Sequence, residues 1–299
     1  MQKHPDFPDL NKAKCNMDHI YNLDDPRPYF SIHEQLAYRI PDAASAVFRR
    51  LIASIRKLHD QEVVHIVDLG CSYGVNAAQL KYDLSMQDLY RHWAQPPTAD
   101  QSPDQIVADQ RKFFTSMQPK PNLRITGIDQ ANNAVGFAQA SRLLDRGLNI
   151  NLEREPLPEP VADDLATTNL LISTGCVGYV TEKSFDRLMP ALAKQPAAWI
   201  ANFVLRMFPY QKIDNCLAKW GYVTEKLAGT TFIQRRFASA DEKKNVLAKL
   251  AAQNINPAGE DETGNLVAEL YLSRPAREAQ LQPLAQILPD KLPGSIQTP

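Results

Sequence analysis

The sequence predicts an α/β protein with a mostly parallel sheet, and three observations support this prediction. Short apolar strands alternate with helical segments over residues 61–240, which is typical of parallel sheets. The first strand, Val63–Leu69, is mostly apolar, as expected for a strand buried on both faces. A turn of small residues and a new helix follow it directly, so free backbone N–H groups should lie at the edge of the sheet.

The expected elements follow in order along the chain. A helical arm or lid at residues 1–60 ends in an amphipathic helix at about 43–59. Four further strands are expected at 123–129, 148–154, 169–173 and 198–205. Two last runs, 221–227 and 230–239, are predicted to form a terminal antiparallel hairpin, which completes a seven-stranded sheet. Residues 241–299 are expected to form a C-terminal helical extension and tail.

Composition narrows the class of protein. The 299 residues are 44% hydrophobic with a net charge of −1, so no bulk charge favours nucleic acid or a membrane surface. No apolar run approaches the length of a membrane span, and the N-terminal residues lack the apolar core of a secretory signal. Four scattered cysteines and six scattered histidines form no metal-binding pattern. We therefore expect a cytoplasmic protein without a metal.

The turn after the first strand is the most informative motif. It reads Asp68-Leu-Gly70-Cys71-Ser72-Tyr-Gly74 and lacks both the third glycine of the dinucleotide fingerprint and the lysine of a P-loop. It resembles motif I of the class I S-adenosylmethionine (SAM) methyltransferases, which have a Rossmann-like fold. Ser72 replaces the middle glycine of that motif, which is compatible with the turn if its φ is negative.

The resemblance implies a SAM site along this edge of the sheet. The motif residues named above and Asn76 would line the cofactor. Asp129 ends the second strand, where an acid of this family binds the two ribose hydroxyls, and Gln130 would lie near the adenine. An ordinary helix N-cap is the alternative role of Asp129. The two acids are 129 − 68 = 61 positions apart instead of ~20, which predicts a helical insertion at 82–121, either a substrate lid or a surface hairpin.

Two further strand ends supply candidate residues. Thr174, Gly175 and Cys176 follow the fourth strand and should line the cofactor, with Tyr179 on the substrate side. The Asn-Pro-Pro-Tyr run of amino-group methyltransferases is absent here, which disfavours methylation of DNA adenine or protein glutamine. On the fifth strand, Asn202 either holds substrate or satisfies the backbone.

The arm supplies an aromatic cluster. Tyr29 and Phe30 are expected to close over the sulfonium of SAM, where aromatic faces stabilise positive charge, although both could equally anchor the core. His33 is the candidate general base of this arm.

The resemblance implies a SAM-dependent methyltransferase that acts on an O- or N-nucleophile of a small molecule. Two alternatives stay open. The first is an enzyme that consumes SAM itself by closing or transferring its aminobutyrate arm, as azetidine-2-carboxylate synthases do. The second is a non-catalytic SAM-binding protein. A homodimer is also left open, with the insertion as a candidate contact.

Overall fold

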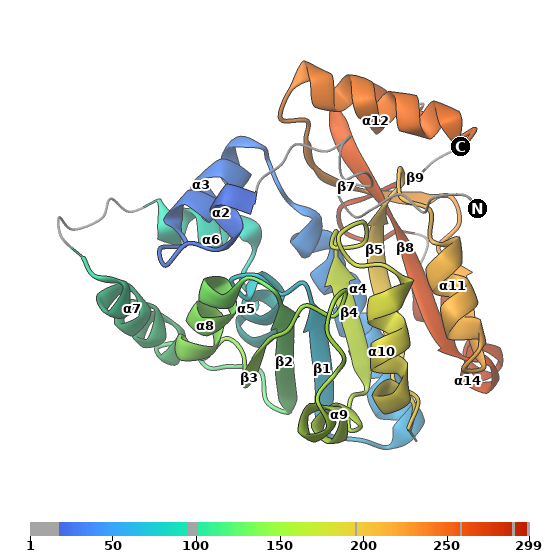
Figure 1. Cartoon of the computed structure of the whole chain (residues 1–299), viewed down its shortest axis with the longest axis horizontal. Helices are drawn as coiled ribbons and strands as arrows, with labels where there is room; N and C mark the ends of the chain where they lie inside the picture. The colour runs from blue at the N-terminus through green and yellow to red at the C-terminus, as the bar shows by residue number, and fades with distance from the viewer. Residues whose placement is uncertain (1–17, 95–100, 195, 258, 289–290, 298–299) are drawn as a thin grey trace.

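The computed structural model describes residues 18–94, 101–194, 196–257, 259–288 and 291–297, and it centres on one twisted sheet (Figure 1). Within these residues the sheet has nine strands in the order β3-β2-β1-β4-β5-β8-β7-β9, with β6 also paired to β8. The strands are β1 Val64–Leu69, β2 Leu123–Asp129, β3 Arg146–Asn149, β4 Leu170–Thr174, β5 Trp199–Leu205, β6 Tyr222–Lys226, β7 Thr230–Arg236, β8 Asn265–Pro275 and β9 Ser295–Gln297.

Helices cover both faces of the sheet (Figure 1). They are α2 Asp18–Tyr21, α3 Arg27–Gln35, α4 Ile40–His59, α5 Val75–Tyr82, α6 Met86–Trp93, α7 Pro103–Thr115, α8 Asn132–Ala140, α9 Glu159–Leu165, α10 Glu182–Leu192, α11 Gln211–Ala218, α12 Ala240–Ala252, α13 Glu260–Thr263, α14 Ala276–Leu281 and α15 Leu284–Ile287. In the part of the chain that the structure describes, none of them is long and apolar enough to span a bilayer.

The parallel half confirms the predicted fold class. β1 pairs in parallel with β2 and β4, β2 pairs with β3, and β4 pairs with β5. Every residue of β1 and β5 is buried, as expected for strands covered on both faces. The third strand, β3 at Arg146–Asn149, is shorter than the strand predicted at 148–154 and begins two residues earlier. The carboxyl ends of β1, β2, β3 and β4 therefore meet along one edge of the sheet.

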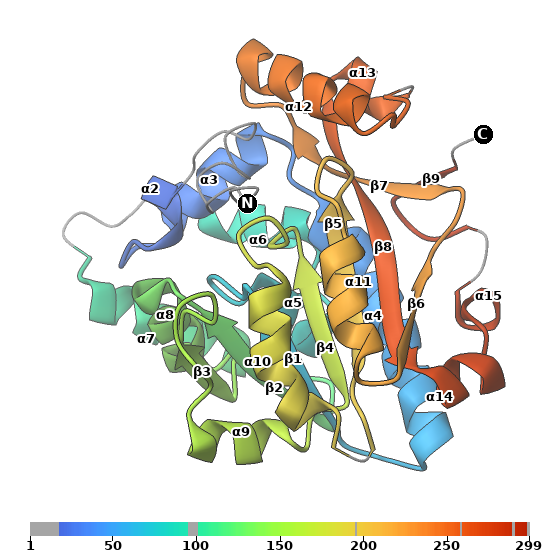
Figure 2. The ribbon, with the colours of Figure 1, turned by 45° about the vertical axis from the view of Figure 1, so that its right-hand side comes forward.

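The sheet ends in antiparallel strands, as predicted, but these strands pair with different partners from those expected. The runs expected to form a hairpin with each other both pair with β8 instead, β6 with Tyr271–Pro275 and β7 with Asn265–Ala268. They are two halves of one interrupted strand, broken at residues 227–229 (Figure 2). The hairpin prediction was wrong because a glycine between two apolar runs does not reveal whether the chain reverses there.

The C-terminal segment contains helices α12 to α15, but it also contains a central strand that we did not expect. Its apolar run, Leu266–Leu272, belongs to β8, which lies inside the sheet and pairs antiparallel with β5 as well as with β6 and β7. Without β8, this edge of β5 would be left unpaired. The described residues of this segment therefore contribute to the core and do not simply pack against it.

Candidate active site

The turn after β1 holds a strained backbone at the edge of the sheet. Gly70 and Gly74 have φ of +76° and +78°, values that favour glycine. Ser72 has φ of +46°, so the expectation of a negative φ at this position was wrong. A left-handed serine costs roughly 1–2 kcal/mol, and its backbone N–H is held by Asp129 Oδ2 at 2.9 Å. Such strain is common where backbone must approach a ligand.

The backbone of Cys71 is part of this turn, but its thiol points away from the turn toward β2. Its side chain packs against β2, where a Cβ on Gly127 would lie 2.6 Å from the Cys71 Sγ. Burial raises the pKa of the Cys71 thiol well above its usual range. Together with Cys176 and Cys216 it is a free thiol, while Cys15 lies outside the described residues.

Asp68 is a fully buried acid with an unsatisfied oxygen. Its Oδ1 accepts a hydrogen bond of 3.0 Å from Asn76 Nδ2, whereas Oδ2 has no partner among the described residues. Burial raises the pKa of Asp68 to about 7, against the opposing effect of the Asn76 bond. Asn76 also donates to Thr174 Oγ1 at 3.2 Å, which connects the α5 start to the β4 exit. A buried carboxylate in this state calls for a cationic or hydrogen-bond-donating ligand.

Asp129 lies where a diol-binding acid is needed. Its two oxygens each accept one backbone N–H, Oδ2 from Ser72 at 2.9 Å and Oδ1 from Ala131 at 3.0 Å. Each oxygen keeps a further lone pair, so the carboxylate can still accept two hydroxyl protons. Asp129 is not the N-cap of α8, which is Ala131. Gln130 is exposed beside it and accepts from Asn151 Nδ2 at 2.7 Å.

The β4 exit packs closely on the β1 turn. A Cβ on Gly70 would lie 2.7 Å from the Cys176 Cβ, so the glycine permits the two loops to touch. Gly175 has φ of +78°, and the side chain of Gln234 lies over it. Thr174, Gly175 and Cys176 therefore lie together at the strand ends, as predicted.

The arm helices α2 and α3 lie beside α6 (Figure 1), and the arm contains a cluster of buried aromatic residues. Tyr29 and His33 are buried and stacked, with ring centroids 4.2 Å apart. His33 Nδ1 donates to the Tyr29 carbonyl at 2.9 Å, and its Nε2 lies 3.2 Å from the Tyr21 hydroxyl. Burial raises the pKa of Tyr21 well above its usual range, and the charges of Tyr38, Tyr179 and Asp129 raise it further.

The catalytic candidates are only partly brought together. Tyr179 follows the β4 exit, where its N–H donates to the Cys176 carbonyl at 2.9 Å. Asn202 lies within the buried strand β5, where its Oδ1 accepts from Ser173 Oγ at 2.6 Å and its Nδ2 donates to Tyr210 OH at 2.7 Å. The Asn202 amide thus forms hydrogen bonds with buried side chains, and not with the backbone, which was the alternative role expected from the sequence. Arg206, on the same strand end, bonds Asp261 and the Asn256 carbonyl.

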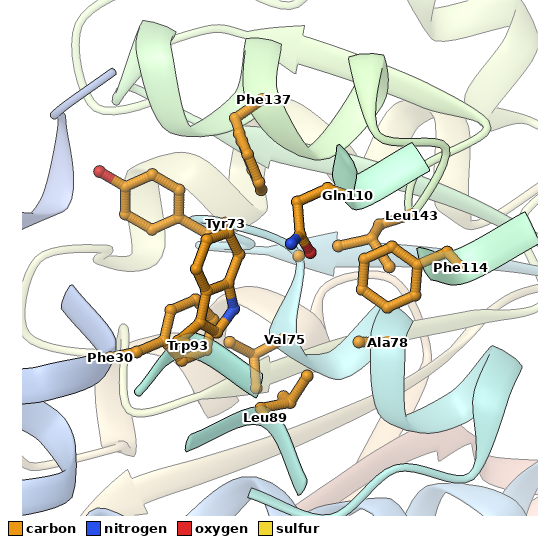
Figure 3. Close-up of a pocket in the computed structure, with 11 residues that line it drawn as sticks. Phe30, Tyr73, Val75, Ala78, Leu89, Trp93, Gln110, Phe114, Phe137 and Leu143 are labelled. Carbon is orange, nitrogen blue, oxygen red and sulfur yellow. The ribbon is translucent and has the colours of Figure 1, made fainter. Parts of the chain in front are cut away.

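The insertion packs against the arm and is not a detached hairpin. Phe30 stacks on Trp93 of α6, with ring centroids 5.2 Å apart. Figure 3 shows these two rings at one side of a small apolar hollow behind the turn. The hollow is lined by Phe30, Tyr73, Gly74, Val75, Ala78, Leu89, Trp93, Gln110, Phe114, Phe137 and Leu143. The insertion therefore supports the arm and the turn together.

Tyr73 connects the turn to the arm. Its hydroxyl accepts from Leu23 N at 2.8 Å and donates to Leu23 O at 2.9 Å. Tyr73→Phe should free the arm, so we expect faster hydrogen exchange over residues 18–36 and SAM affinity about 5- to 30-fold lower, the loss of one or two hydrogen bonds. Exchange mass spectrometry and titration calorimetry measure both. Tyr82→Phe is the matched control, and equal exchange in the two variants would contradict the proposed connection.

Some site residues were missed from the sequence. Asn151 lies two residues after β3 ends. Because β3 pairs in parallel with β2, residues that follow β3 lie at the same edge of the sheet as Asp129, and this pattern could have identified Asn151. Gln234 comes from β7, whose position depended on the wrongly predicted hairpin.

No protein-family model and no curated protein matches the chain. Among solved structures, the plantazolicin methyltransferase BpumL, in complex with a pentazolic desmethylPZN analog and SAH, is 10% identical with a TM-score of 0.46, covering 90% of this chain and 98% of that one. Magnesium protoporphyrin IX methyltransferase (ChlM) from Synechocystis PCC 6803, with bound SAM, is 9% identical with a TM-score of 0.36, covering 78% and 79%.

A third similar structure is the precorrin-6y C5,15-methyltransferase from Geobacter metallireducens GS-15. It is 12% identical with a TM-score of 0.35, covering 75% of this chain and 85% of that one. At such identities the similarity concerns the fold alone. The sheet of this chain itself has five parallel strands in the order β3-β2-β1-β4-β5, followed by the antiparallel β8. The described part of the chain therefore has a Rossmann-like α/β fold with an antiparallel end.

Proposed function

We propose that this protein is a SAM-dependent transferase that methylates an O- or N-nucleophile of a small molecule. The observation that carries the proposal is the pair of acids on adjacent strand ends. Asp68 has a buried oxygen without a partner among the described residues, and Asp129 has acceptor capacity left on both oxygens. One acid suits a cationic amino-acid end and the other suits a ribose diol.

The residues at this edge fit the parts of SAM in order along the sheet. Asp129 would bind the ribose, and Gln130 with Asn151 would border the adenine. Gly70 and Gly74 give the backbone room for close approach, and Ser72 and Asn76 each have a buried oxygen without a partner in the described chain. Thr174, Gly175 and Cys176 would contact the methionyl part.

The protein's own task is mainly to align groups and exclude water. SAM, when bound, supplies a methyl group already activated by its sulfonium. The buried rings of Tyr29 and Tyr38 would shield that centre and face its positive charge. The Tyr21 hydroxyl lies 3.2 Å from His33 Nε2, so we propose that a proton from the nucleophile reaches His33 Nε2 through the Tyr21 hydroxyl. Tyr179 would hold the acceptor beside it.

A second candidate is supported by the enclosure of the site. The arm buries Tyr29, His33 and Tyr38 over the strand ends. An enclosed site favours a nucleophile that arrives as part of SAM, and the α-amine of SAM attacking its own Cγ would release methylthioadenosine and form a four-membered amino acid. No second substrate is needed for this reaction. A cytoplasmic location is proposed for either activity.

Incubation of the pure protein with SAM alone, followed by mass spectrometry, separates the candidates. Methylthioadenosine together with a cyclic four-carbon amino acid, above the level in a protein-free sample, would replace the methyltransferase proposal with the cyclising enzyme. SAM that stays intact but binds in calorimetry supports a methyltransferase, and small acids and amines are then the acceptors to screen. Failure to bind SAM would contradict both.

A further inference from the structure

Gln234 occupies a bulge in β7. The register with β8 shifts between Ile233 and Arg235, which leaves Gln234 as the extra residue. Its carbonyl accepts from Arg39 N at 2.9 Å, and the N–H of Arg236, two residues further on, donates to the Leu36 carbonyl at 2.7 Å. The bulge thus bonds the chain that leads from the arm into α4. Bulges commonly redirect a side chain toward an active site.

The redirected side chain lies at the β4 exit. Gln234 is 4% exposed, and its Nε2 would be 2.5 Å from a Cβ on Gly175. The amide therefore occupies the space that any other residue at position 175 would fill. Its Oε1 is buried and has no hydrogen-bond partner in the described residues. A buried amide oxygen in this state indicates a ligand that donates a hydrogen bond.

The bulge is held rigidly from behind. Arg235 makes two hydrogen bonds to Glu242, of 2.9 and 2.7 Å, and the two side chains are 2% and 1% exposed. Glu242 also accepts from Ala238 N at 2.7 Å. This fixed pair neutralises the Arg235 charge, so Arg235 itself is not the ligand-binding group. A group held so firmly is preorganised for binding.

Three unpartnered acceptors belong to one continuous set of contacts. Asp68 Oδ2, Asn76 Oδ1 and Gln234 Oε1 are all buried without a described partner. Asn76 bonds both Asp68 and Thr174, and Thr174 precedes the glycine that Gln234 covers. A primary ammonium carries three N–H donors and a positive charge, which matches acceptors that include one carboxylate.

We infer that Gln234 Oε1 binds the α-ammonium of the aminobutyrate arm of SAM, an inference that rests on the proposed function. Gln234 is then a binding residue that the motif I turn does not supply. The probes are SAM and methylthioadenosine, which lacks the arm. Both are titrated by calorimetry into the full-length protein, Gln234→Leu, Gln234→Glu and the surface control Gln211→Glu.

Gln234→Leu should weaken SAM binding roughly 10- to 100-fold, as expected for one hydrogen bond to a charged group, and leave methylthioadenosine binding unchanged. Gln234→Glu keeps the acceptor and should bind SAM at least as tightly as the wild type. Unchanged SAM affinity in Gln234→Leu would overturn the inference, as would an equal loss for both probes. Weakening by Gln234→Glu would also overturn it, because the amide would then face the SAM carboxylate. If the wild type binds neither probe, the proposed function itself fails.

Discussion

Asp129→Ala is expected to lower SAM affinity about 100-fold or more. The substitution removes the two acceptors proposed for the ribose hydroxyls, each worth roughly 1.5–3 kcal/mol as a hydrogen bond to a charged group. It also releases the Ser72 N–H, which Asp129 Oδ2 holds at 2.9 Å, so the strained turn loses its support. Titration calorimetry with SAM measures the affinity.

Two further variants sharpen the Asp129 test. Asp129→Asn keeps one acceptor oxygen and should lose affinity by an intermediate factor of about 10. Asp163→Ala removes an acid whose side chain is 83% exposed, and it should leave SAM binding unchanged. If Asp129→Ala bound SAM like the wild type, the ribose assignment would be wrong.

Asp68→Asn is expected to stabilise the ligand-free protein while weakening SAM binding. Burial raises the pKa of Asp68 from its usual 3.8 to about 7. The native state therefore holds a proton that the unfolded state has released, so stability falls as pH rises from about 4 to 7. Above pH 7 the ionised carboxylate costs roughly 4 kcal/mol. An asparagine avoids this cost, and we expect a higher melting temperature at pH 8, measured by calorimetry.

The SAM affinity of Asp68→Asn should change in the opposite direction. The ionised carboxylate is the form that pairs with a cation, so wild-type affinity should rise between pH 6 and pH 8, by at most about tenfold per pH unit. In Asp68→Asn the affinity should be lower and lack this dependence. A variant with a lower melting temperature at pH 8 would contradict the buried-charge argument. A variant with wild-type affinity would contradict the contact with SAM.

Local patterns were enough to predict where the residues proposed to bind the cofactor lie in the fold. Asp68 and Asp129 each end an apolar strand, and adjacent parallel strands bring their carboxyl ends together. The Gly70–Gly74 turn was predictable for a similar reason. It directly joins the strand β1 to the helix α5, so its position follows from the local sequence alone. The φ of Ser72 was mispredicted because the Asp129 bond that holds it comes from another strand.

The rest of the site depends on contacts between distant segments. Gln234 reaches Gly175 only because β8, far along the chain, lies between β5 and β7. No local pattern reveals that β6 and β7 share one partner. Asn202 shows the same limit, because a polar residue in an apolar strand can serve a ligand or a neighbouring side chain, and here it bonds Ser173 and Tyr210.

The most direct test of the central claim is calorimetric titration of the wild-type protein with SAM at pH 8. The account predicts saturable binding at a single site per chain, because Asp68 is then ionised and the strand-end acceptors are arranged for this ligand. The absence of binding under these conditions would contradict the assignment of the site and the function proposed for it.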